Sequence, residues 1–129
     1  MSNPVLVLAS TSPYRRELLT RLGIPFEVAA PEVDETPHAG EGPADTALRL
    51  AQEKARALAH RYPGALIIGS DQVATLDNLQ IGKPGNHERA VAQLQLMRGR
   101  TVIFHTALAL YDSRNDSVQV KDVQTEVDF

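Results

Sequence analysis

Residues 5–13, VLVLASTSP, decide the fold. The first five of them are all apolar and predict a buried strand. Ser12 suits the N-cap of a helix and Pro13 suits its first turn, so we expect a helix over residues 13–22 with Gly23 just past its end. A buried strand that leads directly into a helix is typical of α/β proteins, in which helices cover a sheet.

The rest of the chain alternates in a similar way between apolar segments and helical patterns. This order predicts an α/β fold with helices layered on a partly mixed sheet. Ser70, Asp71 and Gln72 are expected at the end of a strand. The expected elements beyond the first helix are strand 26–29, loop 30–42, helix 43–62, strand 65–69, a hairpin of 73–76 and 79–81 around Asp77-Asn78, loop 82–85, helix 87–97 with Gly99 as its cap, and strands 101–111 and 118–129.

The last strand carries two further signals. Its apolar residues change phase near Lys121 and Asp122, which predicts a β-bulge or a break. It also ends on Phe129 with nothing to cover it, and uncovered apolar strands are a liability that proteins avoid. We therefore expect residues 1–129 to be a single domain that is incomplete at its C-terminus.

Composition excludes several classes of protein. The 129 residues contain no cysteine, which rules out disulfide scaffolds, thiolate metal sites and cysteine nucleophiles. A net charge of −3 argues against a broad nucleic-acid-binding surface, although a local basic cluster can still hold an anion. No stretch has the length of a membrane span or a secretory signal, so we expect no membrane partner and a cytoplasmic location.

Two basic residues fall on helix faces that should be apolar. At 3.6 residues per turn, Arg15 lies among the leucines of the first helix and Lys54 lies on the alanine face of the second. An unpaired buried charge is very costly, so each cation needs an anion. Either they pair with internal carboxylates such as Asp71 or Glu35, or they face a cleft that accepts a polyanion.

Other residues fit a phosphate site. Ser10 and Ser12 lie where a strand meets a helix N-terminus, a place that favours anions, although most such loops only cap the helix. Lys83 lies in a small Gly-Lys-Pro loop and is otherwise a surface lysine. Asp71 follows an apolar strand, where α/β sheets usually place their chemistry, but it also suits a turn.

Acidic residues in loop 30–42 add a candidate metal site. Together with Asp71 they offer the oxygen ligands that Mg²⁺ or Mn²⁺ prefers, and otherwise they form a solvated loop. The three acids are Glu32, Asp34 and Glu35. The four histidines show no ligand spacing and are interpreted as surface or structural residues.

Several motifs, taken in order, resemble those of the Maf-type nucleoside triphosphate pyrophosphatases. The resemblance covers essentially all the residues present. Each motif is short, but their order and spacing are specific. The matching motifs are Ser10-x-Ser12-x-x-Arg15-x-x-Leu18-Leu19, Glu32-Val33-Asp34-Glu35, Glu53-Lys54-Ala55, Gly69-Ser70-Asp71-Gln72 and Gly82-Lys83-Pro84.

The resemblance implies a three-layer α/β/α fold with an elongated mixed sheet and a central cleft, usually in a homodimer. It implies hydrolysis of a nucleoside triphosphate to the monophosphate and pyrophosphate with Mg²⁺ or Mn²⁺. Asp71 would accept the proton of the attacking water, and Glu35, with Asp71, would hold the metal or the water. Family members usually continue well past Phe129. The residues that would bind phosphates are Ser10, Ser12, Arg15, Lys54 and Lys83.

Within the family, the chain is most similar to the 7-methyl-GTP pyrophosphatase branch. Tyr14 would hold the positively charged N7-methylguanine by stacking and cation–π attraction, and Gln72 would bond a base edge. Helix packing and a turn are the plain alternatives for these two residues. The dTTP/UTP branch, a non-catalytic nucleotide-binding regulatory module and an unrelated phosphate-binding α/β domain stay open as alternative functions.

Overall fold

The computed structural model describes residues 5–76, 79–81 and 86–128. Strands and helices follow one another in the α/β order that the sequence predicts. No helix in these three ranges is long and apolar enough to cross a membrane. The elements are β1 (Leu6–Ala9), α1 (Pro13–Thr20), β2 (Glu27–Ala29), α2 (Pro43–Arg56), β3 (Leu66–Leu76), β4 (Leu79–Ile81), α3 (His87–Met97), β5 (Thr101–Asp112) and β6 (Ser117–Asp128).

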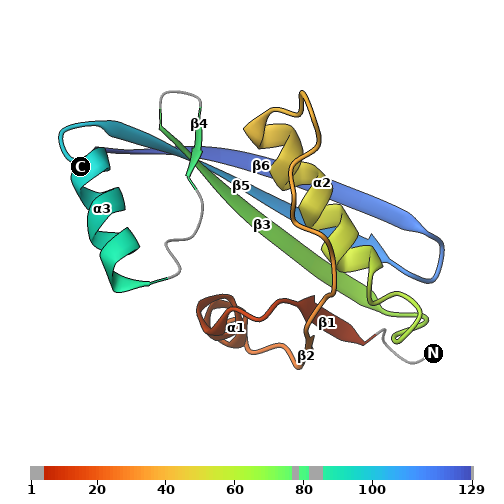
Figure 1. Ribbon diagram of the computed structural model, residues 1–129. Helices are drawn as coiled ribbons and strands as arrows, with labels where there is room; N and C mark the ends of the chain where they lie inside the picture. Colours follow the sequence, from red (N-terminus) through yellow and green to blue (C-terminus); the bar gives the residue numbers. More distant parts are fainter. Residues whose placement is uncertain (1–4, 77–78, 82–85, 129) are drawn as a thin grey trace.

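The strands form one mixed sheet in the order β2-β1-β3-β5-β6, with β4 paired to β3. β1 runs parallel to both β2 and β3, whereas β5 runs antiparallel to β3 and β6. Figure 1 shows β3, β5 and β6 as long strands that give the sheet its elongated shape, with α2 lying along one side of it. The predicted α/β class with a mixed sheet is confirmed.

The core lies between α2 and the sheet and is built from small residues. Ala51 and Ala55 of α2 are fully buried, as is Ile67 of β3. The two elements approach so closely that a Cβ on Gly69 would lie 2.0 Å from the backbone oxygen of Ala51. Only glycine allows this contact, so Gly69 sets the distance between α2 and β3.

The opposite face of the sheet is covered loosely. α1 lies on this side and contains no buried residue. Leu18 and Leu22 are 41% and 64% exposed, and Leu108 of β5 is 49% exposed. Three layers are therefore present, but α1 does not pack tightly against the sheet and leaves apolar side chains between them exposed.

One edge of β3 is open at its middle. β1 pairs with this strand up to Gly69, and β4 pairs with it from Ala74 onward. Since β5 occupies the other edge from Leu66 to Thr75, β1 and β4 share the remaining edge. Between them, no strand in the described part of the chain pairs with residues 70–73 on that edge.

Most predicted boundaries are confirmed, but two need correction. α2 ends at Arg56 rather than near Tyr62, because the chain tightens into turns in which Ala59 N–H donates to the carbonyl of Arg56 at 3.0 Å. Ser70–Gln72 do not end a strand: β3 continues through them to Leu76, paired residue by residue with β5. The predicted turn Asp77-Asn78 and loop 82–85 lie outside the described residues.

The predicted bulge in β6 is wrong. Lys121 and Asp122 pair with Leu108 and Ala107 in an unbroken register. Two residues paired across antiparallel strands point to the same face of the sheet. The apolar residues of β6 before Lys121 therefore lie on the face covered by α2, and those after Asp122 lie on the other face. β6 is an outer strand with mostly exposed side chains, so neither face demands strict alternation.

Candidate active site

The loop between β1 and α1 is held in shape by its own serines. Ser10 N–H donates to the carbonyl of Ala29 at 3.1 Å, and Ser10 Oγ accepts from Ser12 N–H at 3.0 Å. Ser12 Oγ accepts from Arg15 N–H at 3.3 Å and so caps α1, as predicted. Both hydroxyl oxygens therefore fix the backbone of the loop at the N-terminal, positive end of a helix dipole.

Lys54 of α2 links two carboxylates. Its ammonium lies 2.8 Å from Asp71 Oδ1 and 2.8 Å from Glu35 Oε1, and it donates to the carbonyl of Ser70 at 3.5 Å. The Lys54 and Asp71 side chains are only 12% and 9% exposed, whereas that of Glu35 is 57% exposed. The pairing that the sequence left open as an alternative for Lys54 is therefore present.

The charge state of Lys54 follows from these partners. Burial alone would lower its pKa, but the hydrogen bonds with Asp71 and Glu35 outweigh burial and raise the pKa above its ordinary value of 10.5. Lys54 thus stays an ammonium at neutral pH.

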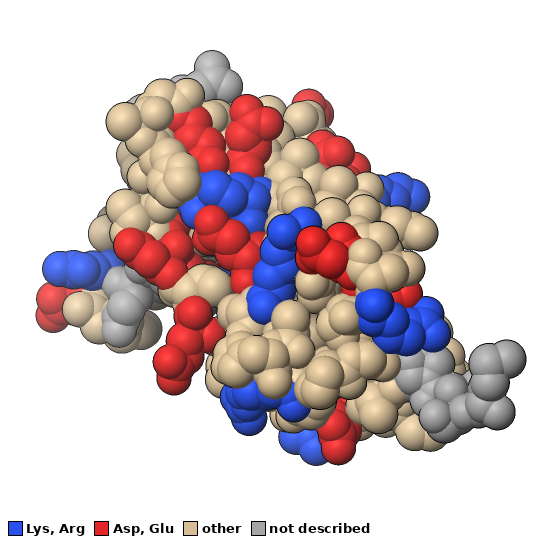
Figure 2. All heavy atoms as spheres, turned by 90° about the vertical axis from the view of Figure 1, so that its right-hand side faces the viewer, with Lys and Arg blue, Asp and Glu red and all other residues tan. Residues whose placement is uncertain are grey.

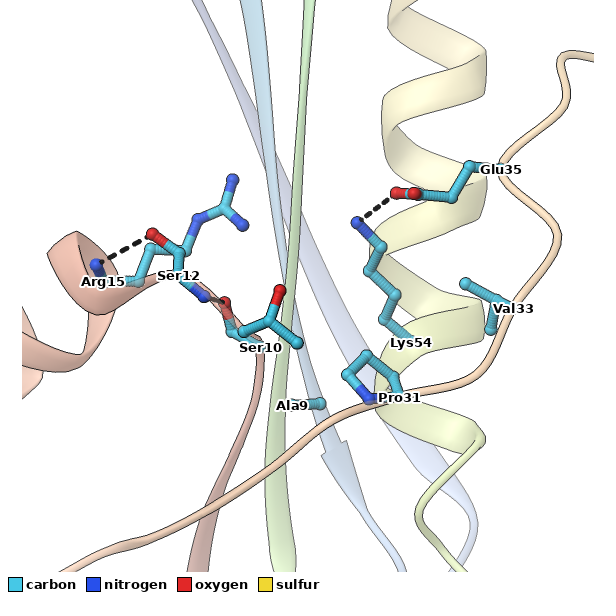
Figure 3. A pocket seen from close by; sticks show the side chains of 9 residues that line it. Ala9, Ser10, Ser12, Arg15, Pro31, Val33, Glu35 and Lys54 are labelled. Carbon is cyan, nitrogen blue, oxygen red and sulfur yellow. Dashed lines mark hydrogen bonds and ion pairs between the residues drawn. The ribbon is translucent and has the colours of Figure 1, made fainter. Parts of the chain in front are cut away.

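Arg15 and Lys54 face each other across a hollow of about 390 Å³, which we call the polar hollow. Figure 3 shows the two side chains entering from opposite sides, Arg15 from α1 and Lys54 from α2. Arg15 makes no ion pair with any described residue. The polar hollow is lined by Ala9, Ser10, Thr11, Ser12, Arg15, Pro31, Val33, Glu35 and Lys54.

A second hollow of about 660 Å³ opens on the α1 side of the sheet, and we call it the apolar hollow. Ser12 and Arg15 line both hollows, so the two adjoin. Tyr14 is 69% exposed and therefore does not serve as helix packing. Gln72 lies in β3, not in a turn, and donates to Thr106 Oγ1 at 3.2 Å. The apolar hollow is lined by Leu8, Ser12, Tyr14, Arg15, Leu18, Leu19, Leu22, Ile68, Ser70, Gln72, Thr106 and Leu108.

The topology explains why these residues meet. In the sheet, β1 lies between β2 and β3. The segment of chain that connects β2 to β3 therefore crosses from one side of β1 to the other. Ligands of α/β sheets usually bind at the carboxyl ends of strands where the strand order reverses. Ser10 follows the end of β1, and Asp71 lies beside it on the open edge of β3.

Some predicted site residues are not brought together. Lys83 lies outside the described residues. Glu32 and Asp34 lie in the acidic loop, but Asp34 is used locally, accepting from Thr36 N–H at 3.0 Å. Within the described ranges, no group of three or more His, Asp or Glu side chains could hold a metal ion. Of the predicted metal ligands in the described part of the chain, Glu35 and Asp71 both contact the Lys54 ammonium.

The sequence analysis missed an ionic network beside the site. Arg49 Nε lies 2.7 Å from Glu41 Oε2, and Arg49 Nη1 lies 3.0 Å from Glu53 Oε2. The hydrogen bonds from Arg49 lower the pKa of Glu41 from 4.5 to about 2. Figure 2 shows Lys and Arg side chains interspersed with Asp and Glu side chains on one face of the molecule. Only the i,i+4 spacing of Arg49 and Glu53 could have been found from sequence.

His105 is a buried residue of β5, which agrees with the structural role that was one of the two interpretations of the histidines. It is 8% exposed, and its Nδ1 has no hydrogen-bond partner in the structure as described. It pairs with Val73 on β3, two residues beyond Asp71. Its position within a strand of alternating buried residues was the available signal.

Comparisons with known proteins agree with this geometry. The family model described as Maf-like protein matches residues 5–129. A 7-methyl-GTP pyrophosphatase of Cupriavidus metallidurans is 64% identical over 128 residues, covering 99% of this chain and 64% of that protein. One from Ralstonia nicotianae is 62% identical over 126 residues, covering 98% of this chain and 65% of that protein. The chain thus spans less than two thirds of the length of these relatives.

Two solved structures share the fold. A dITP/XTP pyrophosphatase from Mycobacterium abscessus has a TM-score of 0.55 at 23% identity, covering 94% of this chain and 72% of that one. A HAM1 protein from Coxiella burnetii has a TM-score of 0.61 at 22% identity, covering 98% and 73%. At such low identity the likeness concerns the fold alone.

Proposed function

This chain belongs to the Maf-like protein family, and we propose on that basis that it hydrolyses 7-methyl-GTP to 7-methyl-GMP and pyrophosphate. The observation that carries the proposal is the position of Lys54, which joins Asp71 and Glu35 at the border of a hollow whose other side is Arg15. Two cations that face one another suit a phosphate chain. Two carboxylates beside them suit the activation of water.

The triphosphate would lie in the polar hollow. Arg15 offers a fork of N–H donors that matches phosphate oxygens, and Lys54 offers a point charge. The N-terminus of α1, preshaped by Ser10 and Ser12, adds the positive end of its helix dipole. These groups together would stabilise the negative charge that builds up on the departing pyrophosphate.

Asp71 would act as the general base. A water molecule attacks the α-phosphorus, Asp71 takes its proton, and the bond from the α-phosphorus to the bridging oxygen breaks, so that pyrophosphate leaves. The low exposure of Asp71 and its contact with Lys54 support this role, because both fix the carboxylate in place. Glu35, which contacts the same ammonium, would help to orient the water.

The residues fit a divalent metal ion that is shared with substrate. Mg²⁺ is usually held by one or two carboxylates together with substrate phosphates, and Glu35 and Asp71 are the two carboxylates that would hold it, beside the Lys54 ammonium that both of them contact. When bound, such an ion would neutralise phosphate charge. Mn²⁺ accepts the same oxygen ligands.

The base would occupy the apolar hollow next to the phosphates. Tyr14 and Gln72 line it, and an exposed tyrosine ring can stack on a cationic N7-methylguanine. A homodimer, a cytoplasmic location and the organisation of residues 1–129 as one incomplete domain stay predictions.

The test is pyrophosphate release from 7-methyl-GTP, GTP, dTTP and UTP, with Mg²⁺, Mn²⁺ or EDTA. The relative from Cupriavidus metallidurans serves as a full-length comparison. We expect 7-methyl-GTP to be preferred and EDTA to stop turnover. Release from none of the four by this chain would refute the proposal, and binding without release would favour the regulatory module.

A substitution at Asp71 separates chemistry from binding. Asp71→Asn should abolish turnover while leaving triphosphate affinity within about tenfold, because the amide keeps the shape but does not accept the proton. Asp45→Asn makes the same change at an exposed position of α2 and should act like the wild type. Equal rates for Asp71→Asn and wild type would remove Asp71 from its role.

A further inference from the structure

Arg49 of α2 holds several points of loop 30–42, the acidic loop that carries Glu35. Arg49 Nε and Nη2 donate to the two oxygens of Glu41 at 2.7 and 3.0 Å. Nη2 also donates to the backbone carbonyl of Thr36 at 3.1 Å, and Nη1 donates to Glu53 at 3.0 Å. The guanidinium thus contacts the loop at two separate points and its own helix at a third.

Glu41 closes the same loop from its other end. Its Oε1 accepts from His38 N–H at 3.1 Å and from Thr46 Oγ1 of α2 at 2.9 Å. Glu41 N–H donates to the carbonyl of His38 at 3.0 Å. The Arg49 and Glu41 side chains are only 17% and 12% exposed, so water competes little with these bonds. Residues 36–41 are therefore folded onto the first turns of α2.

The position of Glu35 depends on the hydrogen bonds that hold residues 36–41 to α2. It lies directly before Thr36, whose N–H is bonded to Asp34 and whose carbonyl is bonded to Arg49. Glu35 itself is more than half exposed, and an ion pair with an exposed partner holds a chain segment only weakly. Lys54 belongs to the same helix as Arg49, so the helix sets both sides of the Glu35–Lys54 contact.

We propose that Arg49 is a positioning residue, which clamps residues 34–41 to α2 so that Glu35 stays opposite Lys54 and Asp71. This inference rests on the role proposed above for Glu35. It assigns to Arg49 no contact with substrate. Its action passes through the backbone at Thr36.

The test uses Arg49→Lys, which keeps the charge but not the fork that reaches Glu41 and Thr36 together. We expect kcat for 7-methyl-GTP to fall by about 10- to 100-fold with little change in KM, because a small displacement of an aligned group has this effect. Arg21→Lys is the matched control, since Arg21 forms only an exposed pair with Glu17, and it should act like the wild type.

A double variant separates positioning from general stability. In a Glu35→Gln background, Arg49→Lys should cause no further loss of kcat, because the group that it positions has gone. A full, independent loss in that background would overturn the proposal. Glu41→Gln, which weakens the same clamp from its other side, should reproduce the Arg49→Lys effect.

Hydrogen exchange of residues 30–42, measured by mass spectrometry, tests the clamp without any activity. Arg49→Lys should speed exchange in this segment and leave β3 and β5 unchanged. Unchanged exchange would overturn the proposal even if the chain hydrolyses nucleotides. If the wild-type chain releases no pyrophosphate, the proposed function fails, and the exchange result still decides whether Arg49 holds the loop.

Discussion

Replacing Gly69 by alanine should separate α2 from the sheet. The added Cβ would lie 2.0 Å from the backbone oxygen of Ala51 and 2.8 Å from the backbone nitrogen of Ala55. An ordinary contact needs about 3.5 Å, so the helix would have to retreat by roughly 1.5 Å. No flexible side chain can absorb the change, because both contacts are with helix backbone.

The cost can be estimated from similar changes in other cores. One extra carbon in a well-packed core costs about 1–3 kcal/mol. Because this carbon would clash with backbone, we expect Gly69→Ala to lose about 3 kcal/mol of stability. For a domain of this size that corresponds to a fall in melting temperature of roughly 10 °C. The change should also weaken the site, because Lys54 lies between Ala51 and Ala55 and would move away from Asp71.

Thermal unfolding followed by circular dichroism measures the stability, and pyrophosphate release measures the site. Gly42→Ser is the matched control: it changes the N-cap glycine of the same helix, where a serine is favoured and the added Cβ would make only an ordinary contact, 3.8 Å from Asp45 Oδ2. The control should melt at or slightly above the wild-type temperature. A Gly69→Ala chain that melts within about 1 °C of the wild type would refute the close approach of α2 and β3.

Two further predictions concern specificity and acid stability. Tyr14→Arg should lower the preference for 7-methyl-GTP over GTP, because a cation replaces a cation–π partner worth about 0.5–2 kcal/mol; an unchanged ratio of kcat/KM values would reject this role. Glu41 has its pKa lowered to about 2 in the folded chain, so its contribution to stability is complete above the ordinary value of 4.5 and is lost as pH falls toward 2. In urea unfolding, Glu41→Gln should therefore have a lower free energy of unfolding than the wild type at pH 6, and this difference should shrink toward pH 2. A difference that stays constant with pH would contradict the role of Glu41.

Regular periodicity explains what the sequence could predict. Lys54 was placed on the buried face of α2 because a helix repeats every 3.6 residues, and its low exposure confirms this. Ser12 was identified as an N-cap because its side chain acts within three residues of its own position. Such local rules need no knowledge of distant contacts.

Long-range pairing explains what the sequence could not predict. Ser70–Gln72 look like the end of a strand, but β5 pairs with them and extends β3 to Leu76. Arg49 and Glu41 are eight residues apart, a spacing that brings no side chains together in a helix or a strand; they meet only because the loop folds back over α2. The partners of Lys54 were left open for the same reason, since Asp71 is 17 residues away.

The open edge of β3 at residues 70–73 separates rigidity from access. The side of Asp71 that faces this edge can be reached without any inter-strand bond being broken, because the β3–β5 ladder lies on the far edge. The neighbouring loop at Ser10–Ser12 is fixed by its own hydrogen bonds, so both sides of this opening are preformed. A substitution in this loop should therefore alter the site before it disturbs the sheet.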